Sequence, residues 1–167
     1  MISFQEFLRE KAERSGWKER MNARADWLTA VGWLFQRIRA LLRDADPNGV
    51  LEIVEYQVER VEERLGVYDA PALKIRLDAV SVDIVPAGRY APKPLSLINL
   101  LAVPHNESRW GDLSGGRVDV TDGERKHLLL RSIEDERDRW YVVMSNKAGV
   151  TPLDRESLEQ VLQDLLS

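Results

Sequence analysis

A long stripe of apolar side chains between Trp17 and Leu42 constrains the fold of this chain more than any other feature of its sequence. Arg24 alone interrupts the stripe. Its apolar members recur at steps of three, four or seven residues, which places them on one side of a single long helix: Trp17, Met21, Leu28, Val31, Phe35, Ile38 and Leu42. Because such a helix gains most of its stability from packing, another part of the chain or a partner must cover it.

Three more apolar residues lie off this stripe and widen the apolar side of the helix: Trp27, Trp33 and Leu34. A single neighbouring helix cannot cover a side this wide. We expect the rest of the chain to do so, since wide apolar faces usually belong to the protein's own core. A protein partner or a second copy is the alternative, with these three residues as the interaction face. A membrane surface fits less well, because acidic residues accompany the basic ones.

Helices are also predicted on both sides of the long one. Ser3 and Glu6 have the spacing of a capping box, which begins a short helix that ends near Gly16. After the long helix, Asp46 can cap a new helix with Pro47 at its first position. The three-four spacing of its apolar residues predicts this third helix, which ends at Gly66: Leu51, Val54, Val58, Val61 and Leu65. Because the connection between the two long helices is short, we expect them to pack as an antiparallel hairpin.

The segment LKIRLDAVSVDIVP, residues 73–86, predicts a β-hairpin. Its apolar residues are odd-numbered before Asp78-Ala79 and even-numbered after it. With Asp78-Ala79 as a two-residue turn, all six apolar side chains lie on one face of the hairpin. The predicted pairs are Leu77 with Val80, Ile75 with Val82 and Leu73 with Ile84.

The segment GGRVDVTDGERKHLLL, residues 115–130, gathers acidic side chains with a lysine and a histidine. We interpret it as a hairpin with a three-residue turn, Asp122–Glu124, that pairs Val118 with Leu128 and places Asp119 opposite His127. A two-residue turn is the weaker alternative. A nuclease metal site is disfavoured because the glutamate belongs to the turn, and a calcium loop requires a different ligand spacing.

The last part of the chain predicts a strand and a closing helix. The segment Arg139–Met144 is apolar on both faces, as in a central strand. A cap, a proline and an acid at Thr151–Asp154 begin the helix. Its apolar residues pack on the sheet: Leu158, Val161, Leu162, Leu165 and Leu166. We expect the helical and sheet parts to pack together through Trp27, Trp33 and the strand around Trp140.

Composition excludes several function classes. There is no cysteine, which excludes disulfides, thiolate metal sites and cysteine nucleophiles. The net charge is -4, and neither residues 1–70 nor residues 71–167 have an excess of basic side chains, so no nucleic-acid partner is expected. With two histidines and no phosphate-binding glycine loop, we expect no metal and no cofactor. No signal peptide or membrane span is evident, which predicts a cytoplasmic protein without a membrane partner.

The connection Pro86–Gly116 is longer than ordinary loops and is the one segment whose polar residues no structural pattern explains. If the chain has a small-molecule or phosphate site, we place it here. The candidates are Arg89, Lys93 and Arg109 as anion contacts, Trp110 as a stacking surface and His105 as the weak candidate for an acid or base. The alternative is that Trp110 belongs to the core and that the arginines are solvated.

These observations predict an α+β fold. A helical region, residues 1–70, packs as one unit with residues 71–167, an antiparallel sheet of about five strands and a C-terminal helix. The favoured function is a non-enzymatic protein-protein interaction module that binds a protein partner or forms a homo-oligomer. It would be an accessory subunit of a larger bacterial assembly, such as a defence, toxin or immunity system. The alternative is a small-molecule or nucleotide-processing enzyme that uses loop 86–116.

Overall fold

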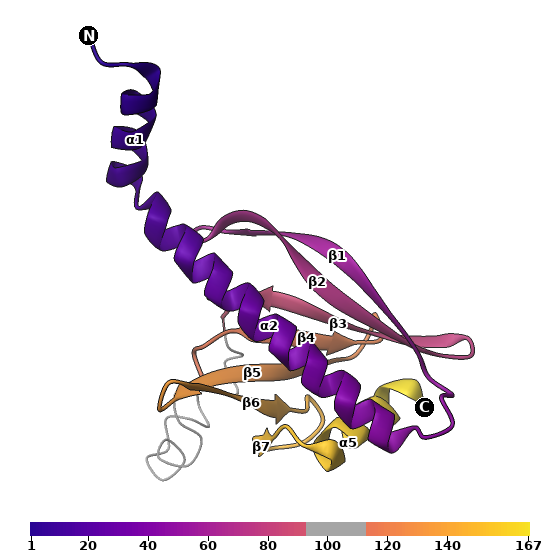
Figure 1. Ribbon diagram of the computed structural model, residues 1–167. Helices are drawn as coiled ribbons and strands as arrows, with labels where there is room; N and C mark the ends of the chain where they lie inside the picture. The colour runs from indigo at the N-terminus through magenta and orange to yellow at the C-terminus, as the bar shows by residue number, and fades with distance from the viewer. Residues whose placement is uncertain (93–112) are drawn as a thin grey trace.

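The computed structural model describes residues 1–92 and 113–167 and has the predicted α+β class (Figure 1). The seven described strands form one antiparallel sheet in chain order, whereas the sequence predicted about five. The described elements are α1 (Phe4–Ser15), α2 (Trp17–Ala45), β1 (Glu52–Glu62), β2 (Gly66–Leu77), β3 (Val80–Gly88), β4 (Arg117–Thr121), β5 (Lys126–Glu134), β6 (Arg137–Val143), β7 (Thr151–Pro152) and α5 (Arg155–Leu166).

Helix α1 begins and ends as predicted. The Ser3 hydroxyl accepts a hydrogen bond from the Glu6 backbone N–H at 3.1 Å, and the Glu6 carboxylate accepts one from the Ser3 backbone N–H at 3.0 Å. Gly16 ends the helix in the left-handed conformation, with φ 70°, and α2 follows immediately. Figure 1 shows α1 projecting past the sheet from one end of α2.

Helix α2 crosses one face of the sheet, and α5 lies beside its C-terminal end (Figure 1). Trp27 is completely buried, and its ring centroid lies 6.2 Å from that of Trp140 on β6. Leu34 is buried in the same core. Trp33 remains 65% exposed, so it does not join the helix to the sheet. The rest of the chain therefore covers most of the wide apolar side of α2, as expected.

Two arginines of α2 donate hydrogen bonds to backbone carbonyls that are distant along the chain. Arg24, which interrupts the apolar stripe, donates from Nε and Nη2 to the Leu65 carbonyl at 3.1 and 2.7 Å. This contact attaches the turn between β1 and β2 to the helix. Arg37 donates from Nη2 to the Leu153 carbonyl at 2.6 Å, just before α5. Because an unpaired carbonyl in a partly buried place is costly, both arginines stabilise the contact between helix and sheet.

The predicted third helix is wrong, because its residues form β1 and the turn that follows. Strand β1 pairs with β2 along its whole length, from Glu52 opposite Arg76 to Glu62 opposite Gly66. Isoleucine, valines and a tyrosine favour an extended chain, and their three-four spacing is a coincidence. Asp46 ends α2 instead of capping a helix, since its carboxylate accepts the backbone N–H groups of the residues that enter β1. The second arm of the predicted helical hairpin is therefore absent.

The β2–β3 hairpin has the predicted register. Leu77 lies opposite Val80, Ile75 opposite Val82 and Leu73 opposite Ile84. Asp78 adopts a positive φ of 51°, as a tight two-residue turn requires. The change of phase in the apolar pattern was therefore sufficient to locate this turn.

The β4–β5 segment is a hairpin, but its register differs by one residue from the prediction. Val118 lies opposite Leu129 and Val120 opposite His127, which leaves a four-residue turn, Asp122–Arg125. The Asp122 carboxylate accepts two backbone N–H groups within the turn, and these bonds stabilise the longer loop. His127 therefore lies on the buried face instead of opposite Asp119.

Asp122 provides a test of this turn through pH. Hydrogen bonds from the backbone N–H groups of Arg125 and Glu124 lower the pKa of Asp122 from 3.8 to about 2. A lowered folded-state pKa means that the carboxylate stabilises the fold above pH 3.8 and loses this effect as the pH falls through about 2. We expect Asp122→Ala to lower the free energy of unfolding at pH 7. The difference in this free energy between the variant and wild type should disappear as the pH falls from 3.8 to about 2. Urea unfolding at several pH values measures this, and Asp122→Asn, which keeps an acceptor oxygen, should lose less.

The C-terminal part follows the prediction with a shift. Trp140, Tyr141 and Val142 of β6 are buried, so this strand is covered on both faces. The helix begins three residues later than expected: Thr151-Pro152 forms β7, and Asp154 is the cap, accepting the Ser157 backbone N–H at 2.8 Å. Proline and a β-branched residue suit an edge strand, which explains the later start.

Candidate functional site

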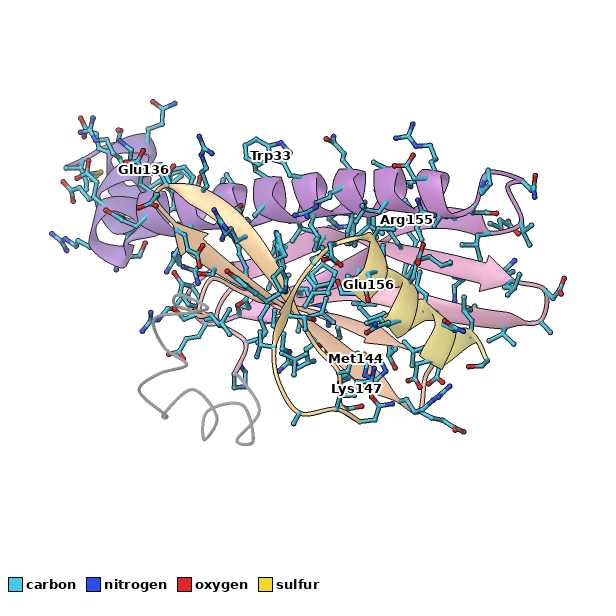
Figure 2. All side chains as sticks on the ribbon, turned by 90° about the horizontal axis from the view of Figure 1, so that it is seen from below. Trp33, Glu136, Met144, Lys147, Arg155 and Glu156 are labelled. Carbon is cyan, nitrogen blue, oxygen red and sulfur yellow. The ribbon has the colours of Figure 1, made fainter. Side chains whose placement is uncertain are left out.

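An open cleft of about 680 Å³ lies between α2 and the β5–β6 hairpin, and the segment after β3 closes one end. Its size is within the usual range for binding sites. Figure 2 shows Trp33 standing out from α2 and Glu136 near the end of α2 that adjoins α1. The charged and large apolar residues that line it are Asp26, Trp33, Leu34, Arg37, Arg89, Tyr90, Arg131, Ile133, Glu136, Arg137, Asp138 and Trp140.

The helical wall of the cleft arises from helix periodicity. Asp26, Trp33 and Arg37 stand seven and four residues apart and therefore share one side of α2. Trp33 exposes 65% of its surface, whereas Trp27 of the same helix is completely buried in the core. An exposed tryptophan with apolar and cationic neighbours is the composition of an interface hot spot.

The opposite wall is the turn between β5 and β6. Asp135 and Glu136 both have positive φ values, 49° and 63°, a conformation that costs a glutamate free energy because of its Cβ atom. This turn presents Arg137 at the cleft, where the guanidinium has no ion pair or hydrogen bond within the described parts of the chain. Ile133 adds an apolar side chain that is 47% exposed.

Arg131 forms the base of the cleft and is 93% buried, since only 7% of its surface is exposed. Its Nη2 donates to the Asp138 carboxylate at 2.7 Å and its Nη1 to the Gly115 carbonyl at 3.0 Å. The Nε atom is buried without a hydrogen-bond partner in the described residues. Removing either partner of this ion pair would be destabilising, because it would leave an uncompensated charge at the base of the cleft.

The end wall holds Arg89, one of the residues proposed from the sequence. The Glu62 carboxylate accepts the backbone N–H groups of Arg89 at 3.2 Å and Tyr90 at 3.0 Å, and it also accepts the Tyr68 hydroxyl. Gly88 allows this close approach, because a Cβ atom there would lie 2.7 Å from Glu62 Oε1. The Arg89 guanidinium stacks over the Tyr90 ring at 4.7 Å and donates to the Ser114 carbonyl at 2.6 Å.

The cleft is locally cationic in an acidic protein. It is lined by four arginines and three carboxylates, and Arg131 and Asp138 neutralise each other. Three arginines then remain against Asp26 and Glu136, whereas the whole chain has a net charge of -4. A cleft with such a local excess attracts anionic groups over short distances.

The structure brings together residues from two separate predictions. Arg89 from the long loop lines the same cleft as Trp33 and Leu34, which the sequence placed on the interaction face. Trp27 and Leu34 are covered by the chain's own core, so Trp33 is the exposed one of the three. The other predicted residues lie outside the described residues: Lys93, His105, Arg109 and Trp110.

Sequence reasoning missed Arg137, Arg131 and Glu62. The predicted third helix gave Glu62 no role, because its hydrogen bonds to the backbone of Arg89 and Tyr90 depend on β1 being a strand. The two arginines had no distinguishing pattern, because each is one of many charged residues in a strand. No local signal could have found them.

A second polar cluster lies at the other end of the sheet, around His127. Its Nε2 lies 2.7 Å from Asp164 Oδ2, and its Nδ1 lies 3.3 Å from the Ser145 hydroxyl. The Ser145 backbone N–H already donates to Nδ1 at 3.0 Å, so that nitrogen is an acceptor and cannot also take the hydroxyl proton. The His127 hydrogen bond lowers the pKa of Asp164. We interpret this cluster as a structural connection between β5, α5 and the loop after β6.

Comparison with known proteins gave no match, whether with protein-family models, curated proteins or solved structures. Within residues 1–92 and 113–167, no group of three or more acidic or histidine side chains could hold a metal ion. The described helices include none that is long and apolar enough to cross a membrane. The cleft geometry therefore carries the functional argument alone.

Proposed function

We propose that this chain is a non-enzymatic protein-interaction module, an accessory subunit of a larger assembly, that receives a partner segment in the cleft between α2 and the β5–β6 hairpin. The observation that carries the proposal is Trp33, exposed beside a cleft whose opposite wall presents Arg137, a guanidinium without an ion pair among residues 1–92 and 113–167. Tryptophan and arginine are the residue types that contribute most binding energy at protein interfaces.

The charge of the cleft defines the partner. Arg37, Arg89 and Arg137 can each donate further hydrogen bonds, because the first two use only one nitrogen on a backbone carbonyl. Guanidinium groups of this kind bind carboxylates in a bidentate manner. Trp33 and Ile133 add exposed apolar surface to the same cleft. The chemistry therefore favours a segment with both acidic and apolar side chains.

The lining groups suit recognition better than proton transfer. An arginine remains protonated in proteins and cannot act as a base, and Asp138 is held in an ion pair. The enzyme alternative depends on His105 and Arg109, which lie outside the described residues. Arg89 is the member of that proposed site that the structure describes, and its backbone is fixed by Glu62.

A peptide selection tests the proposal. Random peptides displayed on phage are selected on the purified protein, and the affinities of recovered peptides are measured by fluorescence anisotropy. We expect sequences enriched in Asp or Glu next to apolar residues. Arg137→Glu should weaken binding at least about tenfold, because it replaces an attractive charge with a repulsive one.

Lys147→Glu is the matched control for this charge reversal. Lys147 is exposed on the loop after β6, well separated from Trp33 in Figure 2, and its reversal changes the net charge by the same amount. Peptides that bind Lys147→Glu as well as wild type, but not Arg137→Glu, support the cleft. Recovery of basic peptides, or equal losses in both variants, would contradict the proposal.

A further inference from the structure

The loop after β6, residues 145–149, is hydrogen-bonded to a buried histidine and to the aspartate beside it. Residues 145–148 are all exposed. The Ser145 backbone N–H donates to His127 Nδ1 at 3.0 Å, and Asn146 Nδ2 donates to Asp164 Oδ1 at 3.3 Å. The histidine itself is only 1% exposed on β5. These hydrogen bonds connect an exposed loop to both β5 and α5.

The hydrogen bonds of the imidazole define which of its nitrogens carries the proton. Because Nδ1 of His127 accepts the Ser145 N–H, it has no proton of its own, and the proton lies on Nε2. Nε2 then donates to the Asp164 carboxylate at 2.7 Å. The imidazole in this arrangement is therefore neutral, with a donor toward α5 and an acceptor toward the loop.

Uptake of a second proton by the imidazole changes these two contacts in opposite ways. A proton on Nδ1 of His127 sets two donors, Nδ1–H and the Ser145 N–H, against each other, so this hydrogen bond must break. The bond from Nε2 to Asp164 becomes a bond between full charges, which strengthens it. The Ser145 hydroxyl, 3.3 Å from Nδ1, can accept the new Nδ1–H once the backbone N–H has turned away.

The charged groups around the imidazole come from three elements. Asp164 on α5 has a lowered pKa, chiefly because of the His127 hydrogen bond, so it stays ionised between about pH 8 and pH 5, where histidines change charge. Arg125, in the β4–β5 turn, has its Nη1 3.6 Å from Asp164 Oδ1 and offsets part of that negative charge. The loop contributes the exposed Lys147, and β4 places the apolar Val120 opposite the histidine. Within this described cluster, the histidine is the residue type that takes up a proton in that pH range.

We propose that proton uptake by His127 releases loop 145–149 from β5, while Asp164 keeps α5 bound to the imidazole. The change is local, because the hydrogen bond that breaks belongs to the exposed loop and the one that strengthens belongs to the packed helix. Figure 2 shows Lys147, in the middle of this loop, apart from Trp33 and Glu136 at the cleft. The inference therefore does not depend on the partner proposed above.

Nuclear magnetic resonance of the ¹⁵N-labelled full chain tests this inference, because it detects the imidazole nitrogens and the backbone amides in one sample. Between about pH 8 and pH 5 we expect Nδ1 of His127 to gain a proton. Over the same range the Ser145 amide signal should shift, and its protection against hydrogen exchange should fall about tenfold, because its acceptor is lost. A Ser145 amide that keeps its signal and its protection while Nδ1 gains a proton would overturn the inference. An imidazole that stays neutral until the whole chain unfolds would overturn it as well.

Three variants assign the transition to this histidine. His127→Gln should remove the pH dependence of the Ser145 signal, and His105→Gln, which replaces the other histidine of the chain, should keep it. Asp164→Asn removes the negative charge that stabilises the imidazolium, so the loop transition should move to lower pH. This variant is expected to fold, because the Asp164 side chain is 24% exposed and asparagine retains an acceptor oxygen. A transition that persists in His127→Gln, or that Asp164→Asn leaves at the same pH, would contradict the proposal.

Discussion

Replacing Trp27 by alanine is expected to lower the free energy of unfolding by about 3–5 kcal/mol, the usual cost of truncating a buried tryptophan. Trp27 is completely buried where α2, β6 and the segment before β4 meet. Its ring contacts Trp140 and covers Gly116, so the cavity left behind cannot close without moving the helix. Urea unfolding followed by far-ultraviolet circular dichroism measures the loss.

Trp33→Ala is the matched control, because it removes the same side chain from the same helix. Trp33 is 65% exposed, and substitutions at such positions usually change stability by no more than about 0.5 kcal/mol. Equal losses in the two variants would mean that α2 is rotated relative to the sheet. A larger loss for Trp33→Ala would place the interaction face in the core.

Gly116→Ala is expected to cost about 3 kcal/mol or more, from two separate causes. Gly116 has φ 133°, a conformation that a residue with a Cβ atom adopts only with strain. An added Cβ would also lie 2.2 Å from Trp27 Cζ3 and 2.6 Å from its Cη2, both in a completely buried ring. The measurement is again the free energy of unfolding in urea.

Gly123→Ala separates the two causes. Gly123 has φ 101° in the β4–β5 turn, but an added Cβ would meet no atom of the described residues within 4 Å. The backbone strain alone should cost about 1 kcal/mol. The close approach of Gly116 to Trp27 is supported if Gly116→Ala loses clearly more than Gly123→Ala, and it is contradicted if the two losses are equal.

The elements that could be predicted from the sequence are those whose apolar pattern fits only one secondary structure and one register. The stripe of α2 extends over seven turns, so chance spacing cannot imitate it. The reversal of phase at Asp78-Ala79 has one register that buries both strands. In contrast, Leu51 to Leu65 matches a helix by spacing and a strand by composition. The decisive factor, eleven residues of pairing with β2, is a long-range contact.

The cleft could not be predicted because its walls come from three distant segments. Trp33, Arg89 and Arg137 are separated by more than forty residues along the chain, and their meeting depends on the position of α2 over the sheet. The error at β1 also hid Glu62, which fixes the backbone of Arg89. The register error at β4–β5 had a local cause, since Asp122 stabilises a four-residue turn by hydrogen bonds that spacing alone does not reveal.

The tryptophan indole N–H signals in a ¹⁵N–¹H NMR spectrum test the proposed binding cleft most directly. The chain has five tryptophans, and substitution of each by phenylalanine assigns its signal. On titration with an acidic peptide recovered by selection, we expect the Trp33 signal to shift and the Trp17 signal on the α1 side to stay in place. A shift of Trp17 without a shift of Trp33 would contradict the proposal that the cleft between α2 and the β5–β6 hairpin receives the partner.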